Sequence, residues 1–124
     1  MSQLNTVALT KLATISGVNM NTAAAQTLFV IPTGFSCIIS HVVVRNASIS
    51  LTTASYSFGF TGAAYNDVIA NATHTELTGA TLYTILAAKI GSKVGVANAL
   101  FSVIMNTLQG VAATSTMEIY GYLF

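Results

Sequence analysis

Short runs of β-branched and aromatic residues recur along this chain, and each run is bounded by Gly, Asn, Ser, Thr or Pro. Such runs are typical of β-strands, because β-branched side chains pack well on a pleated surface and the bounding residues favour turns. Six runs predict strands, at residues 27–31, 35–45, 49–60, 80–88, 99–106 and 112–124. Their spacing predicts an all-β fold: an antiparallel β-sandwich of jelly-roll type with about seven or eight strands.

Several runs alternate between two kinds of side chain, which predicts that one strand face is buried and the other is not. Within the 49–60 run, Tyr56, Phe58 and Phe60 fall on one face and Ser or Gly falls on the other. In the 80–88 run, the two faces carry Leu82, Thr84 and Leu86 on one side and Tyr83, Ile85 and Ala87 on the other. We expect the sandwich core to contain Phe58, Phe60, Phe101, Val103 and Ile119.

The N-terminal part of the chain has a weaker pattern. Residues 5–16 predict a first strand or an arm, and the Asn- and Ala-rich residues 17–26 predict a loop. We therefore divide the chain into an N-terminal arm or first strand, residues 1–26, and a jelly-roll domain, residues 27–124.

Three further segments carry expectations of their own. Residues 61–79 predict the longest irregular segment, which we expect to reach partners together with the N-terminal arm. Helical alternatives remain open at residues 80–90 and 94–105, because short apolar runs fit both periods. The apolar residues 122–124 are expected to lie inside a sheet or against a neighbouring subunit.

Ionisable side chains are scarce in this sequence. Only 6% of its residues are Asp, Glu, Lys or Arg, against about 25% in an ordinary soluble domain, while 53% are hydrophobic. The four basic residues, Lys11, Arg45, Lys89 and Lys93, are too few and too scattered to predict a nucleic-acid partner. Hydroxyl and amide groups cost less to dehydrate than charges do, so a neutral surface suits permanent burial. The composition therefore indicates an obligate homo-oligomer or a component of a larger particle.

Because more than half of the residues are hydrophobic, the chain must also be compared with membrane proteins. A spanning helix needs about 20 apolar residues, and the best window, residues 28–44, is interrupted by Pro32 and Gly34. The first ten residues lack the features of a secretory signal, so we expect no membrane partner. An outer-membrane β-barrel remains an alternative, since Tyr120, Tyr122 and Phe124 alternate as in the C-terminal strand of that class.

No catalytic or metal-binding motif is present. Cys37 and His41 are predicted on the same face of one strand, about 13 Å apart, which is too far for a nucleophile–base pair. His74, Glu76 and Asp67, with His41, are the only candidates for a metal site, and their spacing matches no known ligand pattern. We therefore expect a protein that is not an enzyme, with no catalytic residues, no metal and no cofactor.

Two features remain as candidates for ligand or partner contact. Tyr65, within the 61–79 segment, is the aromatic residue most suited to contact a ligand. Lys89 and Lys93 flank a predicted turn and form either a solvated turn or a small patch for an acidic partner. The intervening Gly91 and Ser92 do not form a phosphate loop, because the upstream Gly and the Lys-then-Ser order are missing.

Four stretches of the sequence resemble a group of small structural proteins encoded near the virion genes of tailed bacteriophages. They are VVVRNAS at 42–48, SFGF at 57–60, the DVIA loop followed by LTGATLY at 77–83, and the closing GYLF at 121–124. The resemblance covers residues 27–124, whereas residues 1–26 depart from it. It implies a jelly-roll β-sandwich that forms trimers and serves as a capsid decoration (cement) protein or a tail-associated protein. It carries no set of functional residues.

The composition and the resemblance together predict a non-enzymatic virion structural protein. We expect a trimeric decoration subunit that binds the major capsid protein on the head surface and is made in the host cytoplasm. One alternative is a tail-fibre or baseplate receptor-binding module, and the other is the outer-membrane-type barrel.

Overall fold

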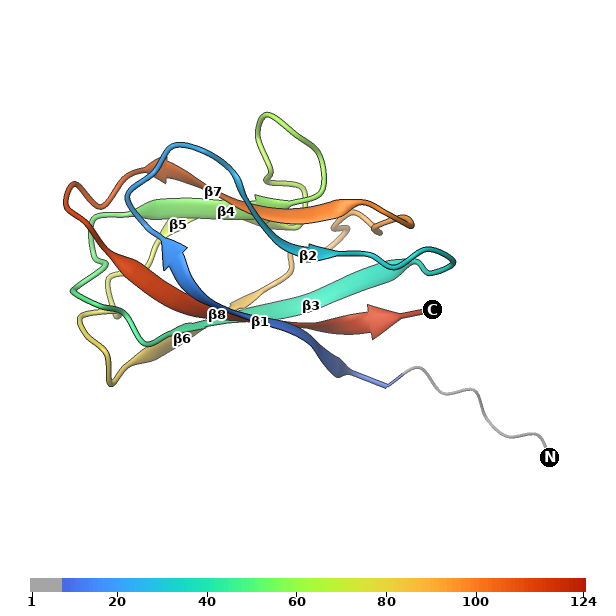
Figure 1. Cartoon of the computed structure of the whole chain (residues 1–124), viewed down its shortest axis with the longest axis horizontal. Helices are drawn as coiled ribbons and strands as arrows, with labels where there is room; N and C mark the ends of the chain where they lie inside the picture. The colour runs from blue at the N-terminus through green and yellow to red at the C-terminus, as the bar shows by residue number, and fades with distance from the viewer. Residues whose placement is uncertain (1–7) are drawn as a thin grey trace.

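The computed structural model describes residues 8–124, and these form eight β-strands joined by turns and loops (Figure 1). The strands are β1 (Thr10–Asn19), β2 (Gln26–Val30), β3 (Cys37–Arg45), β4 (Ser55–Gly59), β5 (Ile69–Thr73), β6 (Tyr83–Ala87), β7 (Leu100–Thr107) and β8 (Thr114–Leu123). The all-β prediction is confirmed. The helical alternatives are wrong, because residues 80–90 contain β6 and residues 94–105 contain most of β7.

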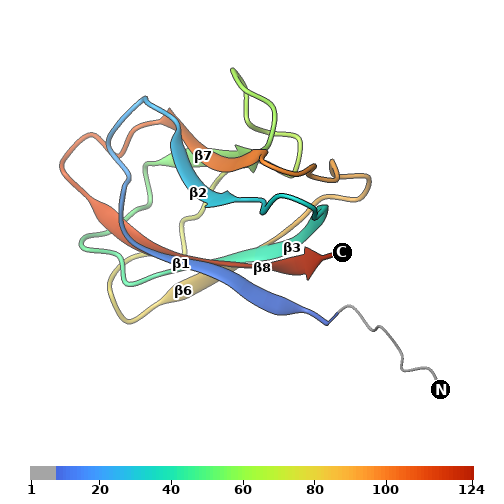
Figure 2. The ribbon, with the colours of Figure 1, turned by 45° about the vertical axis from the view of Figure 1, so that its right-hand side comes forward.

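The strands form two four-stranded sheets, which face each other as two layers (Figure 2). Sheet A has the order β1-β8-β3-β6 and sheet B has the order β2-β7-β4-β5. The first strand therefore pairs with the last, the second with the seventh, the third with the sixth and the fourth with the fifth, all antiparallel. This nesting is the jelly-roll arrangement. Each sheet has two edge strands, so the closed barrel considered as an alternative is not formed.

The core lies between the two sheets and contains the residues expected from the alternation. Phe58, Phe101, Val103 and Ile119 are completely buried, and the partly buried Phe60 packs against them. Phe101 stacks on Phe58 at 6.0 Å between ring centroids and lies 5.3 Å from the ring of Phe60. Each large side chain buried in this way stabilises the fold by about 1.5–3 kcal/mol.

Three boundaries drawn from the sequence are wrong. The strand predicted over residues 49–60 is shorter, because only Ser55–Gly59 form β4. Residues 61–79 are not irregular throughout, because β5 lies within them and pairs with β4. The 17–26 segment is not all loop, because β1 continues to Asn19. Pairing with a neighbouring strand explains these last two errors. β5 reads IANAT, with four exposed residues, and is a strand because it pairs with β4, while the end of β1 pairs with β8 through Val18 and Asn19.

The N-terminal segment and the apolar C-terminal residues both belong to sheet A. β1 pairs with β8 along its length, although residues 1–7 of the predicted arm lie outside the described residues. β8 lies between β1 and β3, and beyond it the backbone of Phe124 pairs with Ser36. The expectation that residues 122–124 lie inside a sheet is confirmed for β8. The division of the chain at residue 26 stays a prediction.

Candidate interaction surface

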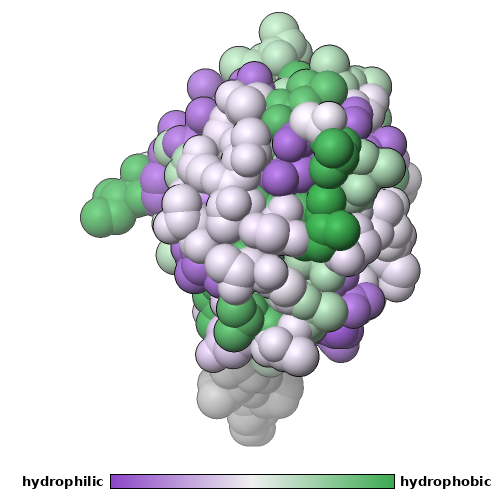
Figure 3. Space-filling view, turned by 90° about the vertical axis from the view of Figure 1, so that its left-hand side faces the viewer, coloured by the Kyte–Doolittle hydropathy of each residue, from purple (hydrophilic) through white to green (hydrophobic). Residues whose placement is uncertain are grey.

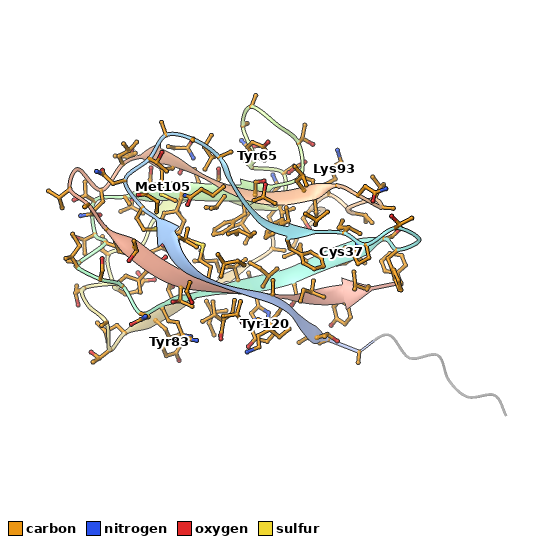
Figure 4. The ribbon with its side chains drawn as sticks, viewed as in Figure 1. Cys37, Tyr65, Tyr83, Lys93, Met105 and Tyr120 are labelled. Atoms are coloured by element: carbon orange, nitrogen blue, oxygen red, sulfur yellow. The ribbon has the colours of Figure 1, made fainter. Side chains whose placement is uncertain are left out.

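Cys37 and His41 occupy opposite faces of β3, so the prediction that they share a face is wrong. A bulge between Ile39 and His41 shifts the register against β8 and reverses the alternation. Cys37 points into the core (Figure 4), and burial raises the pKa of its thiol to about 11. His41 points outward, where its ring stacks on Tyr120 at 4.7 Å between centroids. A protonated, fully buried thiol is a poor nucleophile.

The candidate metal ligands are not brought together. His74 Nδ1 lies 3.7 Å from Glu76 Oε2, and the hydroxyl of Thr84 donates to the same carboxylate. Asp67 uses its carboxylate elsewhere, within the loop that follows β4. Within residues 8–124, no three His, Cys, Asp or Glu side chains are placed to hold a metal ion.

Two buried polar atoms lie beside His74. Tyr56 and His74 have their ring centroids 5.2 Å apart, and within the described chain neither Tyr56 Oη nor His74 Nε2 has a hydrogen-bond partner. Burial raises the pKa of the Tyr56 hydroxyl, and Glu76 raises it further. Burial lowers the pKa of His74, and the opposing effect of Glu76 is smaller. Both side chains are therefore favoured in their neutral forms.

The loop of residues 60–67 projects beyond sheet B and is held by hydrogen bonds (Figure 1). Asp67 accepts hydrogen bonds from the backbone N–H of Phe60 at 2.8 Å and from the hydroxyl of Thr61 at 2.6 Å. Burial raises the pKa of Asp67, but these hydrogen bonds together lower it below its ordinary value. Lys93 Nζ donates to Thr61 Oγ1 at 2.9 Å, and Lys89 Nζ donates to the carbonyl of Asn66 at 3.0 Å. Both lysines therefore brace this loop.

Tyr65 sits on the braced loop, close to Lys93 in Figure 4. Its φ is +43°, and Ala63 has a φ of +76°, so two residues with side chains adopt the left-handed region within three positions. The loop lies close over β4: a Cβ at Gly59 would collide with the Asp67 carboxylate and the Tyr65 backbone. The loop also covers Ser57, whose hydroxyl donates to the carbonyl of Ala64. The sequence did not reveal this cover, which explains why Ser57 is buried although it faces away from the core.

The outer face of sheet A carries large side chains and a small charged network. Glu118 on β8 pairs with Arg45 at 3.1 Å and with Lys11 at 3.5 Å. The hydrogen bond from Arg45 is the main cause that lowers the pKa of Glu118. On the edge strand β6, Tyr83 and Ile85 are 62% and 55% exposed, whereas Thr84 and Leu86 on the opposite face are buried. This face combines exposed apolar side chains with Lys11 and Arg45, the two basic residues that do not brace the loop.

One end of the sandwich is apolar, which the sequence did not predict. We call it the apolar end and define it by six exposed side chains: Val30, Phe35, Val94, Val96, Leu100 and Phe124. They lie where β2, β7 and β8 meet the turns 31–36 and 88–99, beside the labelled C-terminus in Figure 1. Val96 and Phe124 are 64% and 51% exposed. Exposed apolar side chains at one end of the domain make this end a candidate interaction surface.

The opposite end, formed by loops 20–25, 46–54, 74–82 and 108–113, is called the polar end. The side-chain oxygen of Gln109 accepts the backbone N–H groups of Thr53 and Ala54, and that of Asn21 accepts the N–H of Gly110. Figure 3 faces this end and shows mostly neutral and hydrophilic residues, with hydrophobic residues confined to a narrow strip and small patches. Among the residues described, no helix is long and apolar enough to cross a membrane.

The fold is similar to chains of two bacteriophage capsid structures. One match is to a chain of the acidic stable capsid structure of Helicobacter pylori bacteriophage KHP30, with TM-score 0.55 and 12% identity over 96% of this chain and 97% of that chain. Another is to a chain of the cyanophage Pam1 capsid asymmetric unit, with TM-score 0.55 and 13% identity over 98% and 89%. No family model and no curated protein matches the sequence. At this identity the likeness shows a shared fold.

Proposed function

We propose that this protein is a capsid decoration (cement) subunit, which forms a trimer and binds the outer surface of a bacteriophage head. One observation carries the proposal. The matches to the two phage capsid structures span nearly the whole of both chains, so those capsids contain chains of this size as well as of this fold. A decoration role fits a chain of this length, because such a protein adds to a shell without having to enclose the genome itself.

The surface of the chain supports the same role. A stable interface takes roughly 800 Å² from each partner, so two such contacts would cover about a quarter of the 6086 Å² surface of this chain. A subunit that contacts its own copies and a shell would therefore keep about a quarter of its surface out of water. The scarcity of charged residues and the exposed apolar side chains at one end suit such burial.

The mechanism requires binding and no chemistry. Each trimer would bridge neighbouring copies of the major capsid protein, and its binding free energy would add to the work needed to separate them. Reinforcement of this kind needs no catalytic residue, metal or cofactor. The protein would be made in the host cytoplasm and located on the surface of the virion, with no nucleic-acid partner.

The test uses empty shells of the major capsid protein from the phage whose genome encodes this chain. Purified full-length chain is added to the shells, which are then sedimented and heated. We expect saturable co-sedimentation of the chain and a higher temperature of shell disruption. Absence from the pelleted shells, with electron microscopy placing the chain at the tail tip, would favour the receptor-binding alternative instead. In that case Tyr65→Ala would be the first variant to test for loss of host binding.

A further inference from the structure

The edge strand β6 lacks the features that usually keep a sheet edge from pairing with another strand. Bulges, Pro and charged side chains hinder such pairing. In the described part of the chain, the edge strands β1, β2 and β5 each have a register shift against their neighbour, whereas β6 pairs with β3 without one. Residues 77–88, which contain β6, include no Pro, Asp, Glu, Lys or Arg. Among these four edges, β6 is therefore the most open to a further strand.

The register of β6 fixes which of its backbone groups face the open side. The N–H of Ala88, directly after β6, donates to the carbonyl of Ser40 on β3 at 2.9 Å. In an antiparallel ladder, residues that bond to the neighbouring strand alternate with residues that do not. The N–H and C=O groups of Tyr83, Ile85 and Ala87 therefore point away from β3. Outside the β3–β6 ladder, no main-chain hydrogen bond among the described residues uses these groups.

We propose that a second copy of this chain occupies the open edge of β6, with the two β6 strands antiparallel about a two-fold axis beside Ile85. A row of unpaired backbone groups is satisfied by an extended strand, which fixes the chemistry of the occupant. A centre at Ile85 sets Tyr83 opposite Ala87 of the partner subunit, so all three outward-facing residues enter hydrogen-bonded pairs. A shift by one residue would set bonding positions opposite non-bonding ones.

The side chains of β6 suit this register. Tyr83 is exposed and would lie opposite the small Ala87 of the partner subunit, so a large side chain meets a small one. The exposed Ile85 would meet its own copy in an apolar contact. Because the segment carries no charged side chain, two copies meet without like-charge repulsion. A different strand would have to reproduce this match, whereas a second copy supplies it by symmetry.

The contact goes beyond the proposed function and does not depend on it. It needs two copies and no shell, and it uses one edge of sheet A, with β1 at the other edge. On a shell covered with trimers, a two-fold contact of this kind would join a subunit of one trimer to a subunit of the next. A pair of five-residue strands is short, so we expect the contact to be reversible in solution.

The test places cysteines on β6 of the full-length chain and follows their oxidation to disulfides on non-reducing gels. The one natural cysteine, Cys37, is completely buried. At Ile85 the Cα atoms of the two copies would be about 5.5 Å apart, which is within the range of a disulfide. At Tyr83 they would be four residues out of register, more than about 13 Å apart.

We therefore expect Ile85→Cys to form a covalent dimer at least tenfold faster than Tyr83→Cys. The double variant Tyr83→Cys with Ala87→Cys should cross-link as fast as Ile85→Cys, because its two cysteines face each other across the axis. The double variant also replaces Ile85→Cys should that variant fail to fold. Near-ultraviolet circular dichroism checks the fold of each variant.

Two further variants serve as controls. Val111→Cys at the polar end, where the side chain is similarly exposed, gives the rate of random collision. Ile85→Lys would set two ammonium groups opposite each other, so sedimentation velocity should show larger species for the concentrated wild-type chain than for this variant. Folded variants in which Ile85→Cys cross-links no faster than Val111→Cys would overturn the proposal. Faster cross-linking of Tyr83→Cys than of Ile85→Cys would overturn the register and, with it, the two-fold axis at Ile85.

The shell-sedimentation assay separates this inference from the proposed function. A chain that cross-links rapidly through Ile85→Cys but never binds shells leaves the inference intact and rejects the decoration role. A chain that binds shells, but in which Ile85→Cys cross-links no faster than Val111→Cys either in solution or on the shell, keeps the decoration role and overturns the inference.

Discussion

The two ends of the sandwich differ in how far side chains contribute to closing their loops. At the apolar end, main-chain pairing continues beyond the strands: Cys37 and Gly95 exchange hydrogen bonds of 2.9 and 2.8 Å, and Ser36 and Phe124 exchange bonds of 2.8 and 3.0 Å. At the polar end, backbone pairs such as Met20–Ala113 and Leu51–Leu77 are supplemented by side chains: the side-chain oxygens of Gln109 and Asn21 accept further loop N–H groups. The comparison shows that backbone pairing closes both ends and that the polar end relies in addition on side-chain acceptors such as Gln109.

The largest expected effect comes from replacing an aromatic residue of the core. Compared with an exposed aromatic residue of the apolar end, it tests whether both contribute equally to the free energy of unfolding. Phe58 is completely buried against Phe101, so Phe58→Ala should lower the free energy of unfolding by about 3–5 kcal/mol. Phe35 is 44% exposed, and Phe35→Ala should change it by less than about 1 kcal/mol in the monomer. Urea denaturation at a concentration where the chain is monomeric measures both. Equal losses would mean that the apolar end belongs to the folding core.

The next comparison uses one glycine near each end. A Cβ at Gly121 on β8 would collide with the backbone carbonyl of Ile38, and backbone cannot yield as a flexible side chain can. Gly121→Ala should therefore cost about 1–3 kcal/mol or more, because β8 and β3 must separate. Gly79, in a polar-end loop, has open space where a Cβ would lie, so Gly79→Ala should be nearly neutral. Thermal unfolding of the two variants decides, and a neutral Gly121→Ala would contradict tight pairing of β8 with β3.

A third prediction concerns Gln109, whose side-chain oxygen accepts backbone N–H groups at the polar end. Gln109→Ala removes the oxygen that accepts the N–H groups of Thr53 and Ala54, and should cost about 1–3 kcal/mol for unsatisfied donors. Gln109→Glu keeps an acceptor oxygen in place and should restore most of the stability. At the other end, Thr33 donates to Asn98 in an exposed pair, so Thr33→Ala should change the unfolding free energy by less than about 0.5 kcal/mol. Similar losses for Gln109→Ala and Thr33→Ala would remove this distinction between the ends.

The smallest effects are in the pH dependence of stability. The pKa of His74, at the polar end, is lowered from 6.5 in the folded chain, so unfolded chains bind that proton more tightly. Stability should be complete above pH 6.5 and should decline as the pH falls towards the folded pKa. The pKa of Asp67, in the loop beside the apolar end, is lowered from 3.8, so its contribution is present above pH 3.8 and lost below it as the pH falls through the folded pKa.

Urea midpoints measured between pH 7 and pH 3 check both titrations. His74→Gln should flatten the dependence just below pH 6.5, and Asp67→Asn should flatten it below pH 3.8. Unchanged profiles in both variants would show that neither end contributes to the acid sensitivity of the fold.

The prediction of strands succeeded where side chains alternate and failed where pairing partners decide. Tyr56 and Phe58 face the core while Ser57 and Gly59 face away, as alternation along one strand requires. β5 was missed because IANAT has no apolar face of its own. For the candidate site, the scarcity of charge indicated a surface suited to burial but could not place it, because exposure at Val96 or Phe124 depends on which segments cover them.

The sequence by itself determined the all-β class, the inward face of most strands and the neutral character of the surface. These properties follow from covalent geometry and composition, which are local. The tertiary structure decided that a bulge turns His41 outward and away from Cys37, that Lys89 and Lys93 brace a loop, and that six apolar side chains gather at one end. Strand register and side-chain exposure depend on the neighbouring strand or loop. That neighbour is contributed by residues far away in the sequence.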